Sequence, residues 1–126
     1  MNVVDSSGWL EYLAEGINAD HFATTVNDVE RLVVPTIAIY EVVRWTLRER
    51  GEAAAATAMA IMTGGILVDL DQKLAIAAAQ LSIAHHLAMA DAIILATAHR
   101  FEATLWTQDA DFEGLDKVRY FAKTAE

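Results

Sequence analysis

Five acidic residues stand where carboxylates could share a metal ion, and they are Asp5, Glu41, Asp91, Asp109 and Asp111. Asp5 directly follows the apolar pair 3–4, and Asp109 comes three residues after the apolar pair 105–106. Three or four carboxylates at one place repel one another by about 4 kcal/mol per pair at 4 Å. Such a group predicts a divalent cation, and a set of oxygen ligands favours Mg²⁺ or Mn²⁺ over zinc. The expected chemistry is phosphoryl or phosphodiester transfer.

Two of these acids also have a structural explanation. Asp5 and Asp91 stand at expected helix starts, where capping and the helix dipole favour an acid by about 0.3–1 kcal/mol. Glu41 is different because it interrupts the otherwise uncharged stretch 37–43, where a buried acid is costly unless it has a partner. Glu41 therefore favours a functional site, and the open alternative is a catalytically inert domain whose acids cap helices and bind a basic protein.

Short apolar runs alternate with helical patterns along the chain. Strands are expected at 3–4, 32–34, 66–68 and 104–107, with a short edge strand at 118–120. Helices are expected at about 7–16, 18–31, 36–50, 52–62, 71–87 and 91–101. Asn18 or Asp20 is expected to cap the second helix, and Thr36 the third. This order predicts an α/β fold of three layers, α/β/α, with a central, mainly parallel sheet of four or five strands. Ligands of such sheets gather at the carboxyl ends of the strands.

The composition narrows the class of protein. With 126 residues, 55% of them hydrophobic, we expect a single domain over residues 1–126. No cysteine is present, so disulfides and thiolate metal sites are excluded. The N-terminus lacks a signal-peptide pattern, and the uncharged run 53–68 is shorter than the roughly 20 residues that span a bilayer. We therefore expect a cytoplasmic protein without a membrane partner.

Four segments together resemble the PIN domain, and specifically the VapC-type toxins of prokaryotic toxin–antitoxin pairs. They are Val-Val-Asp-Ser-Ser at 3–7, the stretch from Pro35-Thr36 to Glu41-Val42, Met-Ala-Asp-Ala-Ile-Ile at 89–94, and Leu-Trp-Thr-Gln-Asp-Ala-Asp-Phe at 105–112. The resemblance implies a PIN-like fold and an Mg²⁺-dependent endoribonuclease, with Mn²⁺ as a possible substitute. A haloacid-dehalogenase-type phosphatase fits less well, because it would want an aspartate where Ser7 stands.

The resemblance also implies a role for each residue of the site. Asp5, Glu41, Asp91 and Asp109 would be the catalytic acids. Among them, Asp5, Asp91 and Asp109 would hold the metal, and Glu41 would bind a second metal or a metal-bound water. Asp111 would be an auxiliary acid, and Ser6 and Thr107 would be hydroxyls that orient carboxylates.

The expected partners are an RNA substrate, a cognate VapB-type antitoxin and a second copy of the chain in a homodimer, all implied by the resemblance. The net charge of −9 argues against broad contact with nucleic acid. Arg44 and Arg48 lie on the helical face of Glu41 and could bind phosphate locally, although a solvated face explains them equally well. Trp45 is a further candidate for substrate contact. A solitary RNA-processing nuclease without an antitoxin remains an alternative.

Overall fold

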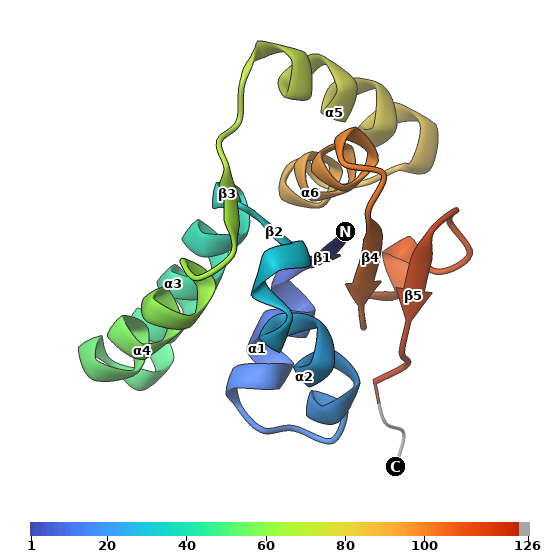
Figure 1. Ribbon diagram of the computed structural model, residues 1–126. Helices are drawn as coiled ribbons and strands as arrows, with labels where there is room; N and C mark the ends of the chain where they lie inside the picture. Colours follow the sequence, from blue (N-terminus) through green and yellow to red (C-terminus); the bar gives the residue numbers. More distant parts are fainter. Residues whose placement is uncertain (124–126) are drawn as a thin grey trace.

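A parallel sheet of five strands forms the centre of the computed structural model, which describes residues 1–123 (Figure 1). The strands are β1 (Asn2–Val4), β2 (Leu32–Pro35), β3 (Ile66–Val68), β4 (Thr104–Thr107) and β5 (Val118–Tyr120). Their spatial order is β3-β2-β1-β4-β5, and every neighbouring pair is parallel. The predicted α/β fold with a parallel sheet is therefore confirmed.

Six helices surround this sheet, and they are α1 (Ser6–Leu13), α2 (Ala19–Asn27), α3 (Thr36–Arg50), α4 (Glu52–Met62), α5 (Gln72–His85) and α6 (Met89–Arg100). In Figure 1, α5 and α6 lie on one side of the sheet and α1 and α2 on the other, with the α3–α4 pair beside β2 and β3. Helix α6 packs against β1, β2 and β4, and α5 packs against α6. The three expected layers are present.

The core explains why the central strands β1 and β2 are nearly uninterrupted apolar runs. Val3, Val4 and Leu105 are fully buried, as is the run Leu32–Val34. Parallel strands covered by helices on both faces need apolar side chains on both faces as well. Helix α6 is likewise buried from Ala92 to Ala98, because it lies between the sheet and α5.

Several helix ends and caps differ from the sequence-based expectation; α1 already ends at Leu13, α5 ends at His85, and α6 begins at Met89. Helix α2 ends at Asn27, and a 3₁₀ turn over Val29–Arg31 follows it before the chain enters the sheet at Leu32. Thr36 does not cap α3, because Pro35 already occupies the N-cap position and Thr36 is the first helical residue. Asn18 precedes α2, yet its side chain makes no capping hydrogen bond. Its buried amide is used elsewhere.

Within residues 1–123, no single helix is both long and apolar enough to cross a membrane. Helices α5 and α6 pass the length and composition criteria only when taken together, with a bend of 113° between them.

Candidate metal centre

The acidic residues reach one edge of the sheet because of where their elements begin and end. Asp5 follows β1 and is the N-cap of α1. Asp109 follows β4 and is the N-cap of the 3₁₀ turn Ala110–Phe112. Asp91 lies in the first turn of α6, and Glu41 lies in the second turn of α3, which starts directly after β2. The ends of β1, β2 and β4 and the N-terminus of α6 therefore bring these acids to the carboxyl ends of the parallel strands.

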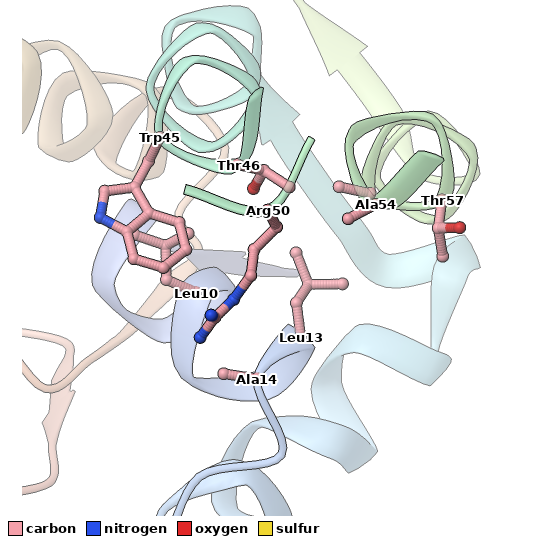
Figure 2. Close-up of a pocket in the computed structure, with 9 residues that line it drawn as sticks. Leu10, Leu13, Ala14, Trp45, Thr46, Arg50, Ala54 and Thr57 are labelled. Carbon is pink, nitrogen blue, oxygen red and sulfur yellow. The ribbon is translucent and has the colours of Figure 1, made fainter. Parts of the chain in front are cut away.

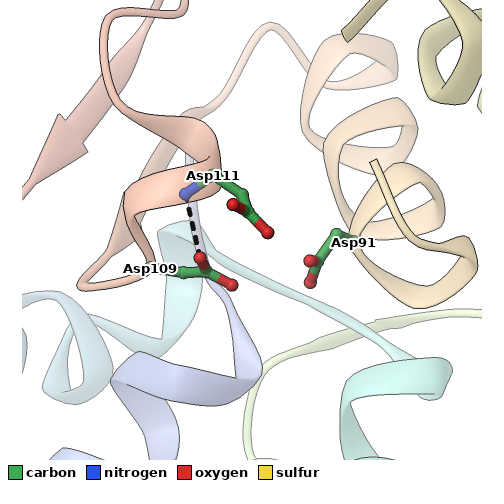
Figure 3. A group of neighbouring side chains, drawn as sticks. All are labelled: Asp91, Asp109 and Asp111. Carbon is green, nitrogen blue, oxygen red and sulfur yellow. Dashed lines mark hydrogen bonds between the residues drawn. The ribbon is translucent and has the colours of Figure 1, made fainter. Parts of the chain in front are cut away.

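Three of these carboxylates converge closely. One ligand oxygen each from Asp91, Asp109 and Asp111 lies within 4.8 Å of the others. Figure 3 shows the three side chains pointing toward one another, from α6 and from the turn after β4. The Asp109 Oδ1 atom accepts a 2.9 Å hydrogen bond from the Asp111 backbone N–H, which fixes the turn that carries both acids.

Asp5 lies beside this group, in a buried cage of donors, with 1% of its surface exposed. Its Oδ2 atom accepts a 2.6 Å hydrogen bond from the Thr107 hydroxyl. Its Oδ1 atom accepts from the Ser7 hydroxyl at 2.8 Å and from the Gly8 N–H at 2.9 Å. The Thr107 oxygen also accepts from the Asp109 N–H at 2.9 Å. Asp5 is therefore held in one orientation and is linked to Asp109 through a single hydroxyl.

Glu41 is half-buried and has one partner. Its Oε1 atom accepts a 2.5 Å hydrogen bond from the Ser6 hydroxyl, which ties the second turn of α3 to the first turn of α1. Ser6 thus contacts Glu41, whereas Ser7 contacts Asp5. Sequence reasoning singled out Ser6 and missed Ser7. The available signal was the Asp-Ser-Ser-Gly run at a helix start, where a hydroxyl two residues after the cap can turn back onto the carboxylate.

The electrostatics of the edge favour protonated acids in the absence of a cation. The pKa of Asp91 is raised to about 7, mostly by burial and then, in decreasing order, by the charges of Asp109, Asp5, Glu41 and Asp111. Burial also raises the pKa of Asp5 to about 6, although the hydrogen bonds from Thr107, Gly8 and Ser7 oppose this shift. A bound cation would reverse both effects by stabilising the ionised carboxylates.

The donor set fits a hard divalent cation. All the converging groups are carboxylate oxygens, which Mg²⁺ and Mn²⁺ prefer. Among residues 1–123 the ion pairs are Arg31–Asp28, Arg48–Glu49 and Arg100–Asp71, so none of them neutralises an acid of this edge. The raised pKa of Asp91 and the three adjacent carboxylates both indicate a site that is electrostatically incomplete without a positive charge.

The basic and aromatic candidates on α3 lie apart from the three-aspartate group. Arg48 pairs with Glu49 at 2.8 Å. Arg44 is exposed and lines an apolar groove over α3 and α4. Trp45 lines a different cavity, of about 340 Å³, between α1, α3 and α4 (Figure 2). The Arg50 guanidinium lies 5.7 Å from the centre of the Trp45 ring.

Both the sequence and the fold resemble those of known proteins. The model of the PIN domain family matches residues 3–118. No curated protein matches the sequence.

Several solved structures share the fold. A toxin–antitoxin complex from Klebsiella pneumoniae has a chain that is 22% identical, with a TM-score of 0.82 over 98% of this chain and 100% of that one. VapC20 from Mycobacterium tuberculosis, described as a toxin that cleaves the sarcin–ricin loop, is 18% identical, with a TM-score of 0.77 over 92% and 95%. VapBC from Salmonella typhimurium bound to DNA is 15% identical, with a TM-score of 0.72 over 96% of both chains. At these identities, the similarity shows a common fold.

Proposed function

Because the chain belongs to the PIN domain family, we propose that it is a metal-dependent endoribonuclease and the toxin of a type II toxin–antitoxin pair. The observation that supports this proposal most strongly is the convergence of Asp91, Asp109 and Asp111 within 4.8 Å, beside the buried Asp5. The expected ion is Mg²⁺, with Mn²⁺ as a substitute, because the ligand set consists of carboxylate oxygens.

The residues of the site have different proposed roles, according to their position and burial. Asp5, Asp91 and Asp109 would hold the ion, which would lower the pKa of a water molecule and stabilise charge on phosphate oxygens. Asp5 is kept in place by Thr107 and Ser7. Glu41 accepts a hydrogen bond from Ser6 on Oε1, and its other oxygen would bind a second cation or accept a proton. Asp111 is an exposed auxiliary acid.

The cavity between α1, α3 and α4 forms a groove beside this site that suits the proposed antitoxin. The cavity in Figure 2 is lined by apolar side chains of α1, α3 and α4 together with Trp45 and Arg50. Leu10 lies one helical turn beyond Ser6, and Trp45 lies one turn beyond Glu41, so the groove starts next to the Ser6–Glu41 contact. An amphipathic segment with apolar anchors and an acidic group for Arg50 would fit here. Several structural neighbours are toxin–antitoxin complexes, which supports such a partner.

A second copy of the chain would cover many of the exposed apolar side chains. Nine of these residues lie on β3, on helices α3 to α6 and in the β3–α5 connection, and they are Tyr40, Leu47, Met59, Ile66, Leu67, Leu70, Ile76, Ile83 and Met89. Exposed apolar surface of this extent is typical of a protein interface. We assign it to a homodimer, in which the same face of both copies meets around a two-fold axis.

The nuclease and the inert partner-binding domain predict different outcomes in one experiment. The purified protein is incubated with total RNA and Mg²⁺, and the new 5′ ends are mapped, with Asp91→Asn as the inactive variant. Asp20→Asn, an exposed acid on α2, is the matched control and should cleave like the wild type. Cleavage that requires Asp91 supports the nuclease. Absence of cleavage together with capture of a basic protein would support the inert partner-binding domain instead.

A second observation separates a toxin from a solitary RNA-processing enzyme. A toxin should be neutralised in the cytoplasm by a small cognate protein, so co-expression with the product of a neighbouring short reading frame should abolish RNA cleavage. A solitary enzyme should remain active under every such co-expression.

A further inference from the structure

Asn18 stands where a helix cap is expected but serves another purpose. It directly precedes α2, and asparagine is among the best N-cap residues. Its side chain nevertheless makes no capping hydrogen bond, and only 7% of the residue is exposed. The amide nitrogen Nδ2 donates to Gln108 Oε1 at 2.9 Å and to the Ala122 carbonyl at 3.0 Å. A buried amide thus links the α1–α2 connection to two distant segments.

Gln108 is the residue through which this amide reaches the acidic edge. It is 8% exposed and stands between Thr107, which binds Asp5, and Asp109. Its backbone N–H donates to the Ser7 hydroxyl at 3.2 Å, and Ser7 in turn donates to Asp5. The side chain of Gln108 therefore anchors the short segment that carries one acid and orients another.

Glu11 closes the same network from α1. Its Oε2 atom accepts from the Asn18 backbone N–H at 2.8 Å, and its Oε1 atom lies 3.5 Å from Gln108 Nε2. Backbone and side chain of Asn18 are thus both fixed, which prevents the amide from turning away from Gln108. Buried polar networks of this kind favour one arrangement of the segments that they join.

We infer that Asn18 is a positioning residue for the metal centre, acting through Gln108 on the segment 107–109. This inference rests on the proposed function in so far as the centre binds a metal. When the amide is removed, Gln108 loses its anchor, and the Asp5–Asp109 spacing set by Thr107 is less well defined. Supporting residues around metal ligands typically change metal affinity by about 10- to 100-fold when they are removed.

The chain offers a matched control, Asn2, whose hydrogen-bond partner lies on β4. Asn2 Oδ1 accepts a 2.9 Å hydrogen bond from Trp106 Nε1, so Asn2 and Asn18 both use a side-chain amide to bind a residue at or beside β4. Asn2 is the first residue of β1, at the opposite end of the strand from Asp5. Loss of its hydrogen bond should cost folding stability without altering the acidic edge.

The experiment compares Asn18→Ala with Asn2→Ala in two measurements. Calorimetric titration with Mn²⁺ should show an affinity for Asn18→Ala that is lower than that of the wild type by about tenfold or more. The affinity of Asn2→Ala should lie within twofold of the wild type. Amide hydrogen exchange of the metal-free protein should be faster at Gln108 and Asp109 in Asn18→Ala only. Asn18→Asp, which keeps a good N-cap but cannot donate, should behave like Asn18→Ala.

The outcomes separate this inference from the proposed function. Equal Mn²⁺ affinities and equal exchange in the two alanine variants would overturn the positioning role, as would wild-type behaviour of Asn18→Asp. A wild-type protein that binds no Mn²⁺ would contradict the proposed function, while the exchange measurement would still decide whether Asn18 holds the segment. If Asn18→Ala does not fold, Gln108→Leu removes the acceptor at similar volume and provides the same comparison.

Discussion

The Thr107 hydroxyl donates a 2.6 Å hydrogen bond to the Asp5 carboxylate. Because the same oxygen accepts the Asp109 backbone N–H at 2.9 Å, it fixes the distance between two acids that come from different strands. A hydroxyl can do this because it is a donor and an acceptor at one atom. Valine has the same shape and neither function.

Thr107→Val should therefore weaken both the fold and the site. The substitution leaves a buried carboxylate and a backbone N–H without this partner, which costs about 1–3 kcal/mol. Mn²⁺ affinity should fall by about 10- to 100-fold, measured by calorimetry beside the melting temperature. Thr107→Ser, which restores the hydroxyl, should recover most of the affinity. Equal affinity in the valine and serine variants would contradict this role.

The metal-free protein should lose stability as the pH rises from about 4 to about 7. The pKa of Asp91 is raised to about 7 from an ordinary value of 3.8, so in this interval the folded state binds more protons at Asp91 than the unfolded state does. Stability falls with pH wherever the folded state holds the extra proton. Asp5, with its pKa raised to about 6, acts in the same direction.

Melting curves of wild type and Asp91→Asn between pH 4.5 and 8 isolate this contribution. The asparagine variant should gain in melting temperature relative to wild type as the pH rises, because it cannot ionise at this position. Saturating Mg²⁺ should remove the wild-type loss, since the cation binds the ionised carboxylates. A constant difference between the two proteins across the pH range would show that Asp91 does not titrate in this way.

Gly8→Ala should destabilise the protein although alanine favours helices. A Cβ atom at Gly8 would lie 2.7 Å from Val4 Cγ1 and 2.8 Å from Phe22 Cε1. Overpacking of this kind costs about 1–3 kcal/mol, and the Gly8 N–H that binds Asp5 would shift with the helix. Gly64→Ala is the control, because its nearest contact would be an ordinary 3.4 Å to the Ile61 carbonyl. Chemical denaturation of both variants measures the difference.

Ile83→Glu should convert the proposed homodimer into a monomer. Ile83 is 80% exposed on α5, among the apolar residues assigned to the homodimer. A carboxylate buried there in both copies would be unpaired, which is costly in an interface. Ile17→Glu, at a residue that is 76% exposed between α1 and α2, should leave the assembly unchanged. Light scattering after gel filtration reads the mass of each variant, and a monomeric wild type would refute the assignment.

Local patterns in the sequence were sufficient to predict the sheet. Apolar runs such as 3–4 and 32–34 became buried strands at the expected positions, because strands covered on both faces need apolar side chains on both. The position of Asp5 after the first run and of Asp109 after the fourth run indicated the acidic edge. These inferences needed only the rule that parallel strands end together.

The contacts that hold the acids depended on segments far apart in the sequence. Asn18 carries a strong capping signal, yet its amide bonds to Gln108 and Ala122, 90 and 104 residues away. Ser6 and Ser7 are adjacent and chemically identical, but the helix turns one toward Glu41 and the other toward Asp5. Local propensity fixes which side chains stand at an element's end. Only packing of the elements decides which distant partner each one meets, because that choice depends on burial and on satisfying every buried polar group at once.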